Sequence, residues 1–152
     1  MEIKQFSYYE NVTSKKAQNL TLQQVLDKMG DGLKVKIDRT EAEDDHDVRQ
    51  KLKQQTLPAV TWMERYADGA PHKAGTGVLT GVVLTDYDGC SPSEVWKTVS
   101  EKILTHWNDM DQIILGVHPT PSGHGIRILF RWLDDCKSIP ECQAKMSAWL
   151  GM

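Results

Sequence analysis

The chain has 152 residues, of which 39% are hydrophobic and 26% charged, a balance typical of a folded globular protein that argues against wholesale disorder. Its formal net charge is -3 at pH 7, from 18 Lys and Arg against 21 Asp and Glu, so charge alone neither signals nor excludes a nucleic-acid partner. No signal-peptide pattern stands at the start, and no apolar stretch approaches the roughly 20 residues that a bilayer-spanning helix needs. We therefore expect a cytoplasmic protein with no membrane partner.

Length and composition predict a single domain over residues 1–152. No shift in composition and no linker rich in Gly, Ser or Pro divides the chain, and its length suffices for a sizeable core. The three cysteines, Cys90, Cys136 and Cys142, are odd in number and fit no Cys-x-x-Cys spacing. That pattern favours neither a disulfide framework nor a zinc site, so we interpret them as ordinary thiols.

The N-terminal part predicts a strand and a short helix. An apolar and aromatic stretch from Ile3 to Tyr9 is typical of a strand. Thr21 and Gln24 have the spacing of a capping box, and the apolar residues between Leu22 and Met29 fall on one helical face. We expect this helix to end at Gly30.

A second, more polar helix is predicted from Glu43 to Gln54. Acidic residues gather over residues 41–47, near its start, where the positive end of a helix dipole favours carboxylates. Pro58 biases Leu57 away from helical angles, so the helix ends by that point. Extended chain is expected from Ala59 to Tyr66.

The middle of the sequence carries the clearest pattern of elements. A strand from Val78 to Tyr87 leads to Ser91-Pro92-Ser93-Glu94, which combines an N-cap serine, a proline at the first helical position and a glutamate at the third. Apolar residues then recur at intervals of four, which predicts a helix packed on a sheet: Val95, Val99, Ile103 and Trp107. The stretch from Asp111 to His118 is expected to return as a parallel strand through a right-handed crossover.

The C-terminal part predicts one more strand and one more helix. A turn-rich stretch, residues 119–123, connects to a strand from Gly125 to Trp132, expected to be the antiparallel neighbour. A last helix covers Glu141 to Leu150. The order of elements therefore predicts an α/β (α+β) fold with a mixed sheet and flanking helices.

Asp86 and Asp88 close the hydrophobic run that begins at Val82. Residues two apart on a strand point to the same face, so both carboxylates should project together where the strand ends. Mg2+ prefers oxygen ligands and is usually held by one or two carboxylates, with waters and substrate phosphates completing the shell. The pair therefore suggests a metal site for nucleotide chemistry. The alternative is a strand that simply ends in an Asp-Gly turn, where Asp is common.

A second candidate site is the run Ser122-Gly123-His124-Gly125-Ile126-Arg127 at the entrance to the last strand. Glycines let the backbone approach an anion and aim successive N–H groups at it, while an arginine fork matches phosphate oxygens. The run therefore favours a phosphate-binding loop. The alternative is a hairpin loop whose His and Arg are merely exposed.

A weaker third feature is a basic stretch among aromatic residues. Arg65 and Lys73 follow Trp62 and flank Tyr66, and cations interleaved with aromatic rings can bind single-stranded nucleic acid. The alternative is that Trp62 and Tyr66 belong to the core.

Four motifs follow one another along the chain, after the N-terminal Asn11-Val12-Thr13-Ser14: Leu57-Pro58-Ala59-Val60-Thr61, Gly77-Val78-Leu79, Leu84-Thr85-Asp86-Tyr87-Asp88 and Pro121-Ser122-Gly123-His124-Gly125-Ile126-Arg127. In this order they resemble the VirE-type N-terminal domain of Bacteroidetes mobile-element proteins. That domain is similar to the archaeo-eukaryotic primase, or primase-polymerase, superfamily. The resemblance covers most of the chain, and the ordered set is more specific than any single motif.

The resemblance implies a catalytic core with an RRM-like mixed sheet. Its first motif falls on Asp86 and Asp88, as catalytic residues and ligands of Mg2+ or Mn2+. Its second motif, a small residue, any residue and then His, would bind the phosphates of the incoming nucleotide and has two placements here. One is Ser122-Gly123-His124, and the other is Gly125-Ile126-Arg127 with Arg in place of His. Both His124 and Arg127 are therefore expected near phosphate.

The sequence departs from the superfamily in its third motif, a further carboxylate after a later strand. Asp134 and Asp135 follow a strand but come too early to replace it. Two-metal nucleotidyl transfer normally requires more than two carboxylates. The resemblance therefore leaves two expectations, a fragment of a longer primase-helicase polypeptide or a truncated protein that binds without catalysing.

Three functions follow as hypotheses. The first is a primase-polymerase domain of a mobile-element replication protein, which binds a nucleoside triphosphate with divalent metal for nucleotidyl transfer. The second is an inactive module that binds nucleotide or single-stranded DNA and partners a P-loop helicase in cis or in trans. The third is a structural adaptor. Fold carries these functions only by analogy.

Overall fold

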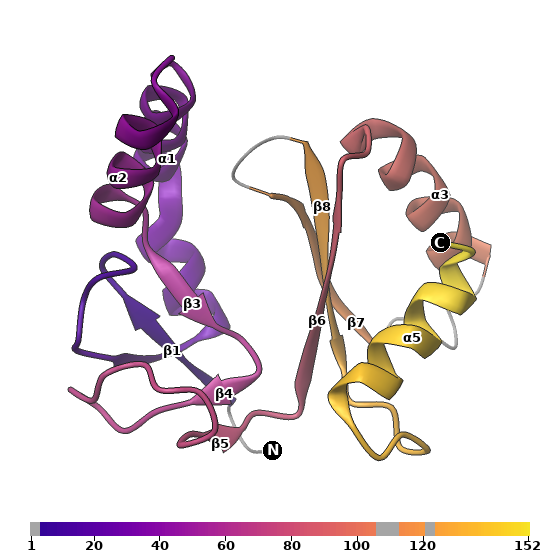
Figure 1. The fold of residues 1–152 in the computed structure, drawn as a ribbon. Coiled ribbons are helices and arrows are strands. Elements are labelled where there is room, and N and C mark those ends of the chain that lie inside the picture. The colour runs from indigo at the N-terminus through magenta and orange to yellow at the C-terminus, as the bar shows by residue number, and fades with distance from the viewer. Residues whose placement is uncertain (1–3, 106–112, 121–123) are drawn as a thin grey trace. The chain divides into compact units, whose positions relative to one another are not determined.

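A computed structural model describes residues 4–105, 113–120 and 124–152 (Figure 1). Residue contacts group the chain into two compact units, Met1–Thr80 and Gly81–Met152, which we call unit 1 and unit 2. Over the described ranges the fold is mixed α+β with small antiparallel sheets, as the sequence predicted for the class. None of the helices in these ranges is long and apolar enough to cross a membrane. The single domain and the cytoplasmic location stay predictions.

The sheet of unit 1 is built around its first strand. Strand β1 (Gln5–Tyr9) lies between β2 (Gln18–Thr21) and β3 (Ala59–Thr61) and pairs antiparallel with both. Phe6 is buried and packs edge-on against Trp62, with ring centroids 5.1 Å apart. The predicted first strand is thus confirmed, although Ile3 lies outside the described residues. Strand β2 was not predicted, because its sequence QNLT lacks an apolar alternation.

Helix α1 (Leu22–Glu41) begins where the sequence predicted. The Thr21 side chain accepts from the Gln24 N–H and the Gln24 side chain accepts from the Thr21 N–H, which completes the capping box. The predicted end at Gly30 is confirmed, because Gly30 leaves helical geometry (φ 31, ψ -161) and divides α1 into two helices joined at a kink. The second of these helices, which continues to Glu41, was not predicted.

Helix α2 (His46–Thr56) starts later than predicted. Asp45 is its N-cap and accepts from the Val48 N–H at 2.9 Å, so residues 43–45 precede the helix and supply the cap. No side chain of α2 is buried. Lys53 of α2 pairs with Glu41 at 3.3 Å, which ties the helix to the end of α1.

The two extended stretches predicted next are each divided in two. Residues 59–66 contain β3 and then β4 (Glu64–Arg65), with a bend between them. Residues 78–87 contain β5 (Val78–Leu79), which pairs with β4, and then the start of β6 (Val82–Asp88). The single predicted strand was wrong because Gly81 adopts a positive φ of 78°, which strand geometry excludes. The break also separates unit 1 from unit 2.

The sheet of unit 2 has the order β6-β8-β7, with β7 spanning Ile114–Pro119 and β8 spanning Gly125–Arg131. Strand β8 is antiparallel to both neighbours, so β6 and β7 run parallel to each other. Helix α3 (Pro92–Thr105) connects them in sequence. The predicted strand-helix-strand connection and the antiparallel neighbour are therefore confirmed, while the predicted start at Asp111 lies outside the described residues.

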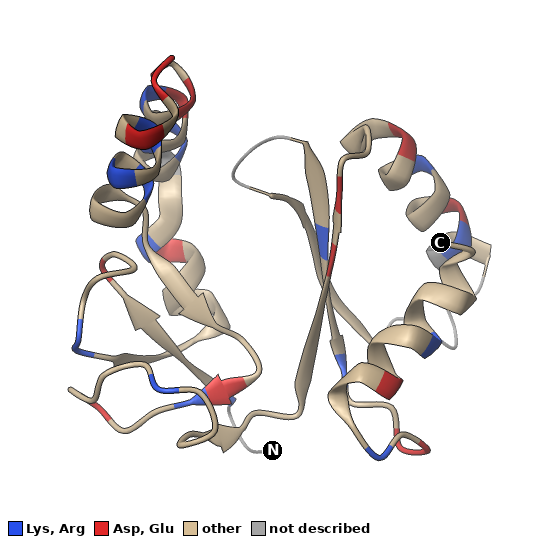
Figure 2. Ribbon diagram, in the orientation of Figure 1, with Lys and Arg blue, Asp and Glu red and all other residues tan. Residues whose placement is uncertain are grey.

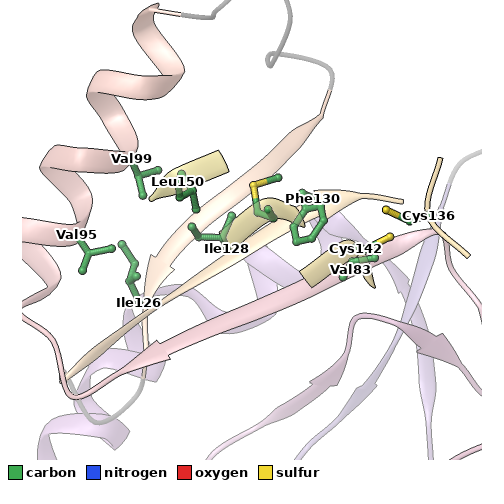
Figure 3. Close-up of a cluster of buried hydrophobic side chains, with 10 residues drawn as sticks. Val83, Val95, Val99, Ile126, Ile128, Phe130, Cys136, Cys142 and Leu150 are labelled. Atoms are coloured by element: carbon green, nitrogen blue, oxygen red, sulfur yellow. The ribbon is translucent and has the colours of Figure 1, made fainter. Parts of the chain in front are cut away.

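The core of unit 2 lies between one face of this sheet and its helices α3 and α5 (Ile139–Leu150). Figure 3 shows these side chains, which come from the sheet, from both helices and, for Cys136, from the segment between β8 and α5. They are Val83, Val95, Val99, Ile126, Ile128, Phe130, Cys136, Cys142, Met146 and Leu150. Two of the four positions predicted for the stripe of α3 are thus in the core; the Ile103 side chain and Trp107 lie outside the described residues. Helix α5 starts two residues before the predicted Glu141, because Ser138 caps it and Pro140 fits its first turn.

Candidate functional site

The candidate site lies on the sheet face of unit 2 that is opposite the helices. Val83 on β6 and Ile126 and Ile128 on β8 belong to the helix-covered core. Because side chains alternate along a strand, Asp86 and Arg127 belong to the opposite face. We call this face the open face.

Three strands each place one polar side chain side by side on the open face. Arg127 of β8 is the register partner of Asp86 on β6 and of His118 on β7. We call these residues the Asp–Arg–His row. Figure 2 shows acidic positions on β6 beside a basic position on β8. The row joins opposite charges across neighbouring strands.

Asp86 and Arg127 form a two-point ion pair. The Arg127 Nε donates to Asp86 Oδ1 at 2.6 Å, and Nη2 donates to Oδ2 at 2.7 Å. Their side chains are 31% and 26% exposed, so water screens the pair only in part. Two parallel N–H···O bonds fix the orientation of both groups. Both carboxylate oxygens of Asp86 are therefore engaged in this conformation.

Asp88 lies one pleat further along β6 and faces Gly125. A Cβ atom on Gly125 would lie 2.8 Å from Asp88 Oδ1, 2.7 Å from the Tyr87 carbonyl oxygen and 3.0 Å from Thr120 Oγ1. Only glycine therefore fits here without displacement. The backbone approaches so closely that the end of β6, the start of β8 and Thr120 after β7 converge around Asp88.

The loop after β6 is attached to the residue before β8. The Cys90 N–H donates to the His124 carbonyl oxygen at 3.1 Å, and the Thr120 N–H donates to the Gly125 carbonyl oxygen at 2.9 Å. Gly89 turns the chain directly after Asp88 with a φ of 67°. The interpretation as an Asp-Gly turn thus describes the local backbone, and it is compatible with a site beside it.

Helix α5 fixes β6 from the covered side. Gln143 donates from Nε2 to the Leu84 carbonyl oxygen at 2.7 Å, and the hydroxyls of Tyr87 and Ser147 share a hydrogen bond of 2.7 Å. Burial raises the pKa of the Tyr87 phenol, and the bond to Ser147 opposes that rise. Tyr87 stands between the two aspartates, so these contacts position the part of the strand that carries them.

The structure brings some of the predicted site residues together. Asp86, Asp88, Gly125 and Arg127 lie on adjacent strands, and His124 precedes Gly125 with its side chain exposed. Ser122 and Gly123 lie outside the described residues.

The weaker prediction concerned unit 1. Arg65 lies on β4, and Lys73 is exposed in the following loop. Trp62 and Tyr66 are buried, which confirms that both rings belong to the core. A nucleic-acid contact at Arg65 or Lys73 stays a prediction.

His118 was missed by the sequence reasoning. It is half-buried, and its Nδ1 lies 3.0 Å from the Pro119 carbonyl oxygen. The sequence did hold a signal, because strands joined by a hairpin pair residues equidistant from the loop centre. Counting outwards from residues 122 and 123 pairs His118 with Arg127.

Two carboxylates on one face fit a hydrated cation that takes its other ligands from water and phosphate. The fit is incomplete in this conformation, since both oxygens of Asp86 bind Arg127. In the described ranges, no cluster of three or more His, Cys, Asp or Glu side chains could hold a metal. Asp134 and Asp135 follow the far end of β8, away from Asp88, and Asp135 pairs with Lys145. They therefore add nothing to the candidate site.

No family model matches the chain, and no curated protein or solved structure matches it either.

Proposed function

We propose that unit 2 binds a nucleoside triphosphate together with Mg2+ or Mn2+ on its open face, as a primase-polymerase-like domain of a mobile-element replication protein. The observation that carries the proposal is the placement of two carboxylates and one guanidinium on the same sheet face. The carboxylates can bind the cation, and the guanidinium can bind the phosphates, of one metal–triphosphate complex.

Each residue has a defined part in this proposal. Asp86 and Asp88 would hold the cation, and the cation would neutralise phosphate charge. Arg127 would bind phosphate oxygens through its planar fork. His124, the backbone beside Gly125 and the preceding Ser122 and Gly123 would contact the same phosphates. His118, beside Arg127 in the Asp–Arg–His row, would be a further phosphate contact.

The topology of unit 2 supports the same proposal. The strand-helix-strand-strand-helix order with a β6-β8-β7 sheet is the order expected of an RRM-like, split βαβ arrangement. On the face opposite the helices, Asp86 and Asp88 are exposed, whereas Val82 and Leu129 are buried. The two aspartates lie on that face at the end of the first strand of the unit.

The test is a titration with a fluorescent nucleoside triphosphate, with and without Mn2+. Wild type is compared with Asp88→Asn, which removes one charge and changes little in shape. Asp134→Asn is the matched control, because Asp134 is exposed in the same unit beyond the far end of β8. Metal-dependent binding that Asp88→Asn weakens at least tenfold and Asp134→Asn leaves intact supports the proposal. Equal binding by all three proteins contradicts it.

The second candidate is a module that binds nucleotide or single-stranded DNA without catalysis and serves a P-loop helicase. It is favoured by the absence of a three-residue metal cluster in the described ranges and by the engagement of Asp86 with Arg127. Such a module would bind single-stranded DNA in a salt-sensitive way, because phosphate contacts release counterions. Binding without Mn2+ and without extension of a primer would favour this candidate over the first.

A further inference from the structure

We infer that the Asp86–Arg127 ion pair couples cation binding to phosphate binding, so that each ligand binds weakly until the other is present. The inference rests on the proposed function and concerns the regulation of the same site. A cation at Asp86 takes the carboxylate from Arg127, and an anionic phosphate then takes the guanidinium. A metal–triphosphate complex supplies both new partners at once.

The geometry makes Arg127 and a cation compete for one carboxylate. Both oxygens of Asp86 accept from Arg127, at 2.6 Å and 2.7 Å, so a cation that binds this carboxylate shares its negative charge with the guanidinium or displaces an N–H donor. In the same way, a phosphate that binds Arg127 competes with Asp86 for the charge of the guanidinium and for its Nε and Nη2 donors. Each side chain therefore weakens binding at the other in the absence of ligands.

The charges of the neighbouring groups favour a joint exchange over a single one. Asp88 makes no ion pair within the described ranges, so the Asp86, Asp88 and Arg127 group carries a net negative charge that attracts cations. A cation that arrives alone leaves Arg127 without its anion. A phosphate that arrives alone adds negative charge beside two carboxylates, and like charges repel.

The size of the effect follows from the exposure of the pair. A ligand that must compete with a partly exposed ion pair of good two-point geometry binds about three to ten times more weakly than it would without that pair. Coupling between two ligands is reciprocal. Bound metal therefore raises the affinity for triphosphate by the same factor by which bound triphosphate raises the affinity for metal. Direct contact between the bound metal and phosphate adds to this factor.

The test is a Mn2+ titration in the absence of nucleotide, followed by the electron paramagnetic resonance signal of free Mn2+. The key variant is Arg127→Gln, which frees Asp86, and we expect it to bind Mn2+ about three to ten times more tightly than wild type. Arg131→Gln is the matched control, since Arg131 is exposed on the same strand and belongs to the same face by alternation. It should bind Mn2+ as wild type does. Arg127→Lys keeps the charge without the fork, so it should be intermediate and serves if the glutamine variant does not fold.

A second titration with a fluorescent nucleoside triphosphate separates the two proposals. If wild type binds the nucleotide in a Mn2+-dependent way but Arg127→Gln and Arg127→Lys bind Mn2+ alone no more tightly than wild type, the exchange is overturned and the proposed function stands. If wild type shows no Mn2+-dependent binding of nucleotide, the proposed function itself is overturned.

Discussion

Gly125 and Asp88 lie opposite each other on β8 and β6, so close that a Cβ atom on the glycine would stand 2.8 Å from the aspartate Oδ1. The same atom would approach the Tyr87 carbonyl oxygen to 2.7 Å. A backbone atom cannot move aside as a flexible side chain does. The sheet therefore closes tightly at the end that carries the candidate site.

Replacing Gly125 with alanine should destabilise the protein by about 2 kcal/mol, because the added methyl group forces the two strands apart. Urea unfolding measures this change in free energy. Gly116→Ala on β7 is the control, since among the described residues its added Cβ would meet only Leu129 Cδ1, at an ordinary 3.9 Å. A loss no larger for Gly125→Ala than for Gly116→Ala would refute the close approach.

Replacing Thr85 with valine should stabilise the protein by about 1 kcal/mol. Thr85 is buried on β6, and in the described ranges its hydroxyl has no hydrogen-bond partner. Valine keeps the shape and removes the unsatisfied polar atom. Thermal unfolding of Thr85→Val, beside the exposed Thr98→Val on α3 as control, tests this. A lower melting temperature for Thr85→Val would show that the hydroxyl has a partner.

Tyr87 and Ser147 should be energetically coupled. Their shared hydrogen bond joins β6 to α5, and its net contribution to the free energy of unfolding is about 1 kcal/mol. A double-mutant cycle with Tyr87→Phe and Ser147→Ala isolates this term. Additive losses in the double variant, with no coupling energy, would argue that the bond does not form in solution.

Stability should fall at alkaline pH in part through Tyr66. Burial, followed by its hydrogen bond to Glu64, raises the pKa of the Tyr66 phenol above its ordinary value of 10.0. The folded state then keeps a proton that the unfolded state releases, so the contribution is complete below pH 10 and is lost as pH rises above it. Urea midpoints between pH 8 and 11 should therefore fall less steeply in Tyr66→Phe than in wild type. Parallel curves would mean that Tyr66 titrates normally.

Local rules predicted much of this molecule. Alternation along β6 placed Asp86 and Asp88 on one face, and the capping signals at Thr21 and Ser91 marked the starts of α1 and α3. These features depend on residues within a few positions of one another. They can therefore be inferred without knowing which strands pair.

The sequence-based predictions failed where the structure depends on contacts between distant residues or on the backbone angles of a single glycine. Gly81 breaks a continuous apolar run through its positive φ, so one predicted strand is two strands in the structure. The Asp86–Arg127 pair joins residues 41 positions apart, so its formation depends on the register of β6 with β8. From the sequence, Asp86 was expected to bind a metal and Arg127 to bind phosphate. Only the pairing of the strands shows that each neutralises the other.

The most direct test of the central claim is the location of Mn2+ on the protein by nuclear magnetic resonance, in the presence of a nucleoside triphosphate. Paramagnetic broadening reports which amides lie near the ion. The amide signals of Asp86, Asp88 and Arg127 should broaden most, and that of Arg131 at the far end of β8 should broaden less, because the effect falls steeply with distance from the ion. Broadening centred instead on the acidic residues 41–47, or none that depends on nucleotide, would contradict this expectation.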